Sequence, residues 1–287
     1  MPAEKRFLIR RMFATDIPAA IGLSRPQRWN QTEEDWRRFL ALEPEGCFVA
    51  VSDGQVIATT TTELFDSVGW IGMVTVSPEW RGQGIGRAMM VHAIAYLHER
   101  GARSVKLDAT PMGKPLYERL GFQEEYVLHR VVGIGVEFAS HDVILYSHAT
   151  PQLQKSMLSL DRRVYHTDRS AMLTKLIAGW PELAAVHLTN GQVDGYIVGR
   201  HGFLYEQIGP LVATNADTAD ALLRWGLNAA AGCRVCLDRP DVNRAACDLA
   251  ESYGLEPLRE FTRMHLGNEP YADAPDEIFA TSGAEKG

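Results

Sequence analysis

The sequence predicts an α/β protein built from two tandem copies of one unit, and two observations predict this class. First, segments with the lengths and turn residues of strands and helices recur in the same order in both halves of the chain. Three pairs match: CFVAVSDGQVIATT (47–60) with AAVHLTNGQVDGYI (184–197), VKLDATP (105–111) with RVCLDRP (234–240), and PLYERLGF (115–122) with CDLAESYGL (247–255). Second, 287 residues is about the length of two typical domains.

The first matched pair is a β-hairpin in each copy, with tight turns at Asp53–Gly54 and Asn190–Gly191. Asp53 and Asn190 are 137 positions apart, whereas Asp108 and Asp238, in the next matched strands, are only 130 apart. The second copy therefore lacks seven residues between these two elements. The matched segments predict domains at 1–139 and 140–267, and the tail 268–287, rich in Ala, Glu, Asp, Pro and Gly, is expected to be partly disordered.

Composition indicates a globular protein of the cytoplasm. The net charge of −7 shows no basic footprint for nucleic acid, and no apolar run or signal peptide indicates a membrane or export. Four cysteines are too few for a disulfide framework, so we expect free thiols. Cys233 and Cys236 form a lone C-x-x-C and the nine histidines are scattered, so no metal site is expected.

The missing residues fall in the interval that holds SPEWRGQGIGRAMM (77–90) in the first copy. There the apolar strand WIGMVTV (70–76) leads through a glycine-rich loop into a helix. Such a helix start leaves several backbone N–H groups unpaired at the positive end of the helix dipole, which is a phosphate site. Arg81 and Arg87 can add charge-assisted contacts to a pyrophosphate. The alternative is a glycine-rich turn that only joins strand to helix.

Two glycine-rich phosphate motifs compete at this position. The dinucleotide motif G-x-G-x-x-G is not spelled here, and the loop follows about four strands instead of opening the first strand–helix unit. The R-x-x-G-x-G at Arg81–Gly86, followed about thirty residues later by PLYERLGF, resembles the acetyl-CoA signature of GNAT acetyltransferases. The resemblance covers residues 6–130, including the opening IRRMFATDIPAAIGL, and the whole chain is similar to tandem GNAT proteins with a degenerate C-terminal unit.

The resemblance implies a fold and a binding mode for acetyl-CoA as co-substrate. Each domain would be a mixed, mostly antiparallel, twisted sheet flanked by helices, with its fourth and fifth strands splayed around the pantetheine arm. The strand would bind the pantetheine amides and the loop the pyrophosphate; the residues are Val74, Thr75, Val76, Arg81, Gly82, Gln83, Gly84, Ile85, Gly86 and Arg87. A backbone N–H near Val74 would stabilise the oxyanion.

Tyr117 is the candidate general acid, because it lies where the family's motif carries a tyrosine that faces the CoA sulfur. A phenol can protonate the departing thiolate. Its counterpart in the second copy is Ala250. The alternative is a tyrosine that packs beside a helix end.

Glu63 and Asp108 are the candidate bases for the attacking amine, acting directly or through water. Asp108 has an equivalent, Asp238, in the copy without the loop, which favours a structural role for both. Glu63 aligns with Arg200 and is specific to the first copy, although an exposed strand-end glutamate is the alternative. Water or the substrate could also act as the base.

The acceptor pocket is expected near the segment SRPQRWNQTEEDW (24–36), with Trp29 and Asn30 as substrate contacts. The competing interpretation is helix capping by Thr32 and Asp35. The second copy should not bind acetyl-CoA, and we expect it to complete the acceptor pocket with Tyr165, His166 and Arg169.

The sequence thus predicts an N-acetyltransferase that moves an acetyl group from acetyl-CoA to a primary amine by direct attack. Three sources of the amine are left open: a small molecule, a protein lysine and a protein N-terminus. The alternative is a non-catalytic acyl-CoA sensor or scaffold. No nucleic-acid or membrane partner is expected, and the protein should be a monomer or homodimer.

Overall fold

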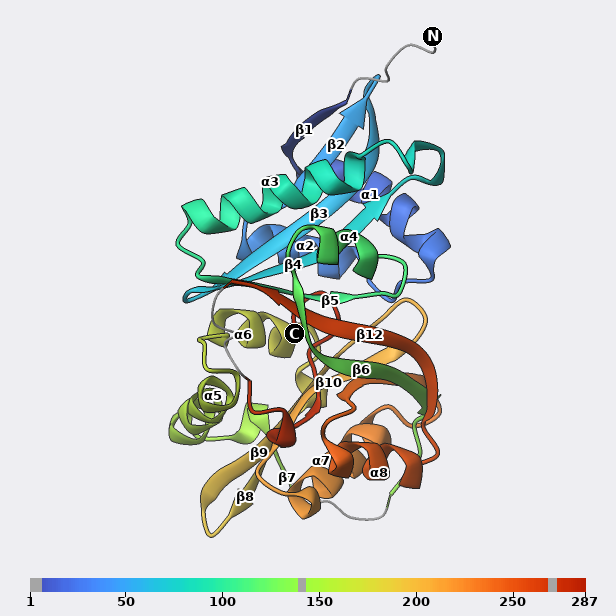
Figure 1. The fold of residues 1–287 in the computed structure, drawn as a ribbon. Helices are drawn as coiled ribbons and strands as arrows, with labels where there is room; N and C mark the ends of the chain where they lie inside the picture. Colours follow the sequence, from blue (N-terminus) through green and yellow to red (C-terminus); the bar gives the residue numbers. More distant parts are fainter. Residues whose placement is uncertain (1–6, 139–142, 268–272) are drawn as a thin grey trace.

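A computed structural model describes residues 7–138, 143–267 and 273–287 (Figure 1). Within these ranges, thirteen strands form one sheet that runs through both halves in the order β1-β2-β3-β4-β5-β12-β6-β11-β10-β9-β8-β7, with β13 paired to β10. The neighbouring pairs are antiparallel except β4–β5 and β10–β11. The predicted fold class, two mostly antiparallel α/β units in tandem, is confirmed.

The elements of the first copy alternate strands and helices as its sequence predicts. They are β1 (Leu8–Arg11), α1 (Ile17–Ser24), α2 (Glu33–Leu42), β2 (Phe48–Ser52), β3 (Gln55–Phe65), β4 (Val68–Val76), α3 (Ile85–Glu99), β5 (Ser104–Ala109), α4 (Lys114–Arg119) and β6 (Gln123–Ile134). Successive side chains of a strand point to opposite faces. Val49 accordingly packs with α1 and α2, whereas Phe48 and Ala50 pack against α3.

The second copy repeats this arrangement. Its elements are β7 (Val143–Leu145), α5 (Pro151–Tyr165), α6 (Ser170–Gly179), β8 (Ala184–Thr189), β9 (Gln192–Arg200), β10 (Glu206–Ala213), α7 (Ala216–Ala229), β11 (Arg234–Pro240), α8 (Arg244–Ser252), β12 (Glu256–Leu266) and β13 (Ile278–Ala280). Helices α5 and α6 share a core with Tyr196 and Val198, and α7 and α8 share another with Ile197. None of the helices in the described ranges is long and apolar enough to cross a membrane.

The two copies exchange their last long strands. Strand β12 of the second copy lies between β5 and β6, and β6 of the first copy pairs with β11 (Figure 1). The sheet of each half is therefore completed by a strand from the other. The predicted junction at 139 and 140 lies outside the described residues, but the copies are joined through their strands as well as through the chain.

Two equivalent ion pairs join the exchanged strands to their neighbours in the other copy. Asp108 on β5 accepts from Arg263 on β12 at 2.9 and 3.0 Å, and Asp238 on β11 accepts twice from Arg130 on β6 at 2.7 Å. All four side chains are buried. The equivalence of Asp108 and Asp238, visible in the sequence, thus corresponds to two equivalent ion pairs that each join one copy to the other.

Residues 273–287 of the tail, which the composition predicts to be partly disordered, pack against both halves. Strand β13 pairs with β10, and the Thr281 N–H donates to the Asp238 carbonyl of β11 at 2.9 Å. Since β10 and β11 pair only at Glu206–Gln207, β13 fills the gap that opens beyond them. The slot that the family fold would use for pantetheine is occupied, in the second copy, by the chain itself. Composition could not reveal this packing because three of the tail's charged side chains, Asp273, Glu285 and Lys286, are buried in ion pairs.

Candidate functional site

The site begins where β4 and β5 separate. The two strands pair in parallel only along Val68–Trp70 and Ser104–Lys106, and they part after these residues. Here, unlike in the second copy, the gap opens into two connected spaces. We call them the outer groove and the inner cavity. Both are lined by Val74, Thr110 and Tyr117, so they meet at these residues.

A β-bulge in β4 shapes the meeting point. Thr59 of β3 faces Thr75 of β4, and Thr61 faces Gly72. Two residues of β4, Met73 and Val74, therefore oppose the single residue Thr60. Met73 has a left-handed φ of 51°, and its carbonyl accepts from the Thr59 hydroxyl at 2.7 Å. A bulge interrupts the ladder and turns backbone groups away from the neighbouring strand. Backbone near Val74 is thereby presented to the gap, as an oxyanion site requires.

The glycine-rich loop forms the rim of the outer groove. Gly82 and Gly84 have φ of 74° and 79°, and a Cβ at either position would meet no atom within 4 Å. Gly84 is the N-cap of α3 and supplies no side-chain cap, whereas Asn215 caps α7 in the second copy by accepting from the Thr218 N–H at 2.9 Å. No side chain caps the first N–H groups of α3, so they can face an anion, whereas in α7 Asn215 already binds the Thr218 N–H.

The charge of the outer groove suits a phosphate-rich ligand. Four arginines line it: Arg81, Arg87, Arg119 and Arg259. Among the described residues that line the groove there is no Asp or Glu, although the chain carries a net charge of −7. Of the ten residues proposed for acetyl-CoA, nine line the groove; Gln83 does not, and its side chain instead donates to the Glu79 carbonyl. Arg119 and Arg259 were missed by the sequence analysis.

Replacing Gly84 by Ala is expected to weaken CoA binding at least about tenfold, or ~1.4 kcal/mol. The methyl group strains a backbone at φ 79° and stands where a phosphate would approach. Isothermal titration calorimetry measures the effect. Gly191→Ala is a matched control, because Gly191 also has φ 79° and open space around it but lies in the β8–β9 turn. Equal losses of affinity in both variants would contradict the assignment.

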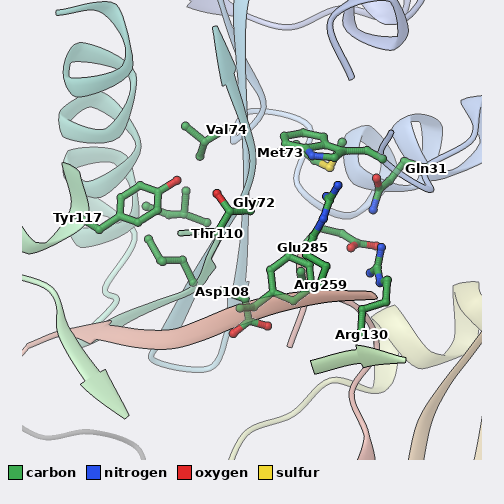
Figure 2. A pocket seen from close by; sticks show the side chains of 15 residues that line it. Gln31, Gly72, Met73, Val74, Asp108, Thr110, Tyr117, Arg130, Arg259 and Glu285 are labelled. Atoms are coloured by element: carbon green, nitrogen blue, oxygen red, sulfur yellow. The ribbon is translucent and has the colours of Figure 1, made fainter. Parts of the chain in front are cut away.

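Tyr117 lies on α4 between the two spaces. Its hydroxyl points into the cavity toward β4 (Figure 2). Burial raises the pKa of Tyr117 to about 12, so the phenol keeps its proton throughout the neutral range. The geometry places a proton donor beside the point where β4 and β5 part.

The inner cavity is built by both copies (Figure 2). The first supplies Trp29, Gln31, Gly72, Asp108, Thr110 and others, and the second supplies Arg259, Phe261, Ala284 and Glu285. The second-copy residues were missed because they reach the site through the exchanged strand β12 and the tail. No local pattern in the sequence marks either feature.

The two candidate bases have different surroundings. Asp108 lines the inner cavity, but both of its oxygens are bound by Arg263. Glu63 on β3 is buried, and neither of its oxygens has a hydrogen-bond partner among the described residues. Burial raises the pKa of Glu63 to about 7; Glu285 adds to the shift, whereas Lys286, Arg38 and Arg169 oppose it. Glu63 does not line either space.

The two predicted acceptor residues of the first copy, Trp29 and Asn30, have different surroundings in the structure. Trp29 lines both spaces. Asn30 is buried and binds the second copy, donating to the Tyr205 carbonyl and accepting from the N–H groups of Leu204 and Tyr205 at 2.9–3.0 Å. Thr32 and Asp35 form the capping box of α2. Asn30 thus fastens the two copies together at the edge of the site.

The residues proposed from the second copy lie behind the inner cavity instead of lining it. Tyr165 is buried at the end of α5, and Arg169 stacks on its ring and binds Asp161 at 2.7 Å. His166 is exposed. Arg169 also donates to the Gly287 carbonyl at 2.8 Å, so it touches the segment that borders the cavity. In the described ranges no group of His, Cys, Asp and Glu gathers as metal ligands do, and Cys236 donates to Gln207.

The family models for sequence match both halves of the chain. Residues 15–122 match the acetyltransferase (GNAT) family and residues 157–280 match an acetyltransferase (GNAT) domain. Holothin acyltransferase of Pseudoalteromonas sp. is 25% identical over 264 residues, covering 91% of this chain and 88% of the relative. A mycothiol acetyltransferase of Thermomonospora curvata is 34% identical over 104 residues, which is about a third of each chain.

Solved structures share the whole fold. A putative acetyltransferase from Pyrococcus horikoshii superposes with a TM-score of 0.84 at 19% identity over 98% of this chain and 96% of its own. A tandem GNAT protein from the clavulanic acid biosynthesis pathway gives 0.64 at 14% identity over 92% and 99%. Together with the two family matches, these similarities show that the chain belongs to the GNAT family of acyl-CoA-dependent acetyltransferases and carries one GNAT domain in each half.

Proposed function

We propose that this enzyme transfers the acetyl group of acetyl-CoA to a primary amine by direct attack, with all of the chemistry in the first copy. The observation that carries the proposal is the junction of the two spaces at Val74 and Tyr117. The outer groove has the charge and the uncapped helix start that hold a diphosphate, and the inner cavity leaves room for an acceptor. Nine of the ten residues proposed for acetyl-CoA line the outer groove.

The reaction balances with the groups of this site. The amine nitrogen attacks the thioester carbonyl carbon, and the backbone N–H near Val74 stabilises the oxyanion. The C–S bond then breaks, and the thiolate takes the proton of Tyr117. The proton that the amine must lose goes to Glu63 directly or through water, and solvent returns a proton to Tyr117.

Glu63 is the better candidate for the base. Asp108 is held by two hydrogen bonds from Arg263, so accepting a proton would break a buried ion pair. Glu63 has unpaired oxygens and a pKa of about 7, which is suited to taking a proton at neutral pH. The position of Asp108 instead suits a structural role at the exchanged strands.

The pH dependence tests this assignment. A base must be deprotonated to act, so below pH 7 the protonation of Glu63 should lower kcat/KM for the acceptor by about a further tenfold per unit, in addition to the fall caused by protonation of the amine itself. The charged groups near Glu63 are Lys286, Glu285, Arg38 and Arg169. In the Glu63→Gln variant, the part of the fall in kcat/KM that is due to Glu63 should disappear. Only the fall caused by protonation of the amine should remain. An identical profile for the variant and the wild type would exclude Glu63 as the base.

The acceptor is proposed to be a small molecule. Holothin acyltransferase, which is named for acyl transfer to holothin, aligns over 91% of this chain and so matches both halves. The lining of the inner cavity combines the aromatic side chains of Trp29 and Phe261 with the polar side chains of Gln31 and Asp108, a mixture typical of sites for small ligands. Thiol release measured with a panel of small amines tests the function: turnover with at least one amine supports it, and tight CoA binding without turnover on any acceptor argues against it.

A further inference from the structure

The segment 282–287 lies between the two copies, against Phe39 of α2 and Gly72 of β4 in the first copy and against Arg169, next to α6, in the second. The C mark in Figure 1 lies near the middle of the molecule, between the two halves. Lys286 has no exposed surface, and its ammonium is 5.0 Å from the centre of the Phe39 ring on α2. Arg200 on β9 donates to the Glu285 carboxylate at 3.1 Å, and Arg169 donates to the Gly287 carbonyl at 2.8 Å.

The segment runs closely over β4, next to the bulge. A Cβ on Gly72 would lie 2.7 Å from the Glu285 carbonyl oxygen and 3.0 Å from its Cα, and the Trp70 ring lies against Gly287. Only a glycine at position 72 allows this approach. Gly72 also lines the inner cavity, so the segment covers the strand where the acceptor must approach.

The segment also separates the candidate base from the reaction centre. Ala284 and Glu285 form part of the wall of the inner cavity, and in Figure 2 Glu285 and Tyr117 lie on opposite sides of it. Glu63 does not line this cavity, and it interacts electrostatically with Lys286 and Glu285 of the segment. An amine in the inner cavity therefore cannot meet Glu63 while the segment is seated.

The groups around the segment form a balanced set of buried charges. This charged cluster contains three acids and three arginines: Asp35, Arg38, Glu63, Asp161, Arg169 and Arg200. The segment adds one acid, Glu285, and one base, Lys286. Burial works against the charge of Glu285, but Lys286 and Arg200 outweigh it and hold the pKa of Glu285 well below its usual range. The space suits a molecule that carries both charges.

The segment is held in a way that allows it to leave as a unit. Its backbone hydrogen bonds are internal: Ser282 N–H donates to Gly287, and the N–H groups of Lys286 and Gly287 donate to Gly283 at 3.0 Å. Its hydrogen bonds with the charged cluster are three, all from arginines: Arg169 donates to the Ser282 hydroxyl and the Gly287 carbonyl, and Arg200 donates to Glu285. A ligand with the same charges can replace these hydrogen bonds without breaking the pairing of any strand.

We propose that the charged cluster is the acceptor site and that segment 282–287 fills it as a built-in competitor of a zwitterionic amine, such as an amino acid or a short peptide. The proposal rests on the proposed function, because it assigns the acceptor of that same reaction. Lys286 takes the place of the acceptor's ammonium beside Glu63, and Glu285 takes the place of its carboxylate beside Arg200. The segment must leave before acetyl transfer can occur.

Lys286→Glu in the full chain tests the proposal, because it places a third acid beside Glu63 and Glu285 and should expel the segment. We expect KM for zwitterionic amines to fall at least about tenfold, since a site that is rarely open binds in proportion to its open fraction. KM for acetyl-CoA should not change. Lys155→Glu is the control, because Lys155 is exposed on α5 and the charge change is the same. The synthetic peptide SGAEKG should inhibit the Lys286→Glu variant competitively against the amine but not against acetyl-CoA.

Hydrogen exchange on the unmodified chain gives an independent test if Lys286→Glu does not fold. A saturating zwitterionic amine with CoA should speed exchange at the amides of 283–287, whereas CoA alone should not. Acetylation by the wild type with these amides still protected would overturn the inference and leave the proposed function intact. CoA binding without acetylation of any amine, by the wild type or the variant, would overturn both.

Discussion

Replacing Tyr117 by Phe should lower kcat by about 10²–10⁴-fold, the usual contribution of a general acid. The substitution removes only the hydroxyl that faces the cavity, so the leaving thiolate loses its proton donor while the ring still fills its place on α4. The dissociation constant of CoA should change little, because the diphosphate is held by the loop and not by the phenol. Steady-state kinetics and calorimetry on the same preparation separate the two effects.

The control for Tyr117 is Tyr253→Phe. Tyr253 follows α8 near the equivalent helix end of the second copy, and its hydroxyl binds Asp220 and Arg224 away from either space. That variant should keep wild-type turnover. Full turnover by Tyr117→Phe would remove Tyr117 from the mechanism and favour the packing role instead.

Replacing Arg263 by Leu should lower the free energy of unfolding by about 3–5 kcal/mol, as expected when one partner of a buried ion pair is lost. Asp108 would keep its buried charge without Arg263, and Asp273, also bound by Arg263, would lose one of its two cationic partners. Burial works against the charge of Arg263, but Asp108, Tyr126 and Asp273 outweigh it and hold the pKa of Arg263 above its ordinary value. Urea denaturation measures the loss.

A second substitution shows whether the loss comes from the unpaired aspartate. Asp108→Leu combined with Arg263→Leu should recover a large part of the stability, because no charge is then left without a partner at position 108. If Asp108 acts only in structure, the double variant should also keep acetyl transfer. A double variant as unstable as Arg263→Leu would contradict this explanation, and one that is stable but inactive would return Asp108 to the list of bases.

The features that the sequence could predict are local ones. The loop from Arg81 to Arg87 and the tyrosine at 117 are marked by spacing, glycines and flanking elements, and these place them on the same gap of the sheet. Comparison of the copies was equally informative: the loss of seven residues before α7 corresponds to a helix that caps itself with Asn215.

The features that could not be predicted depend on contacts between distant parts of the chain. Strands β6 and β12 pair residues that are far apart in the sequence, such as Val127 with Thr262, so no local pattern shows which strand completes which sheet. Arg259 and Phe261 reach the cavity only through this exchange. The tail looked polar, yet Glu285 and Lys286 are buried: Glu285 accepts hydrogen bonds from both Lys286 and Arg200.

A crystal structure of the intact protein with CoA tests the central claim most directly. We predict one CoA per chain, with its diphosphate oxygens within hydrogen-bonding distance of the backbone N–H groups of residues 82–87 and its pantetheine arm between β4 and β5. A CoA bound beside α7 in the second copy, or a diphosphate held away from the start of α3, would contradict the account.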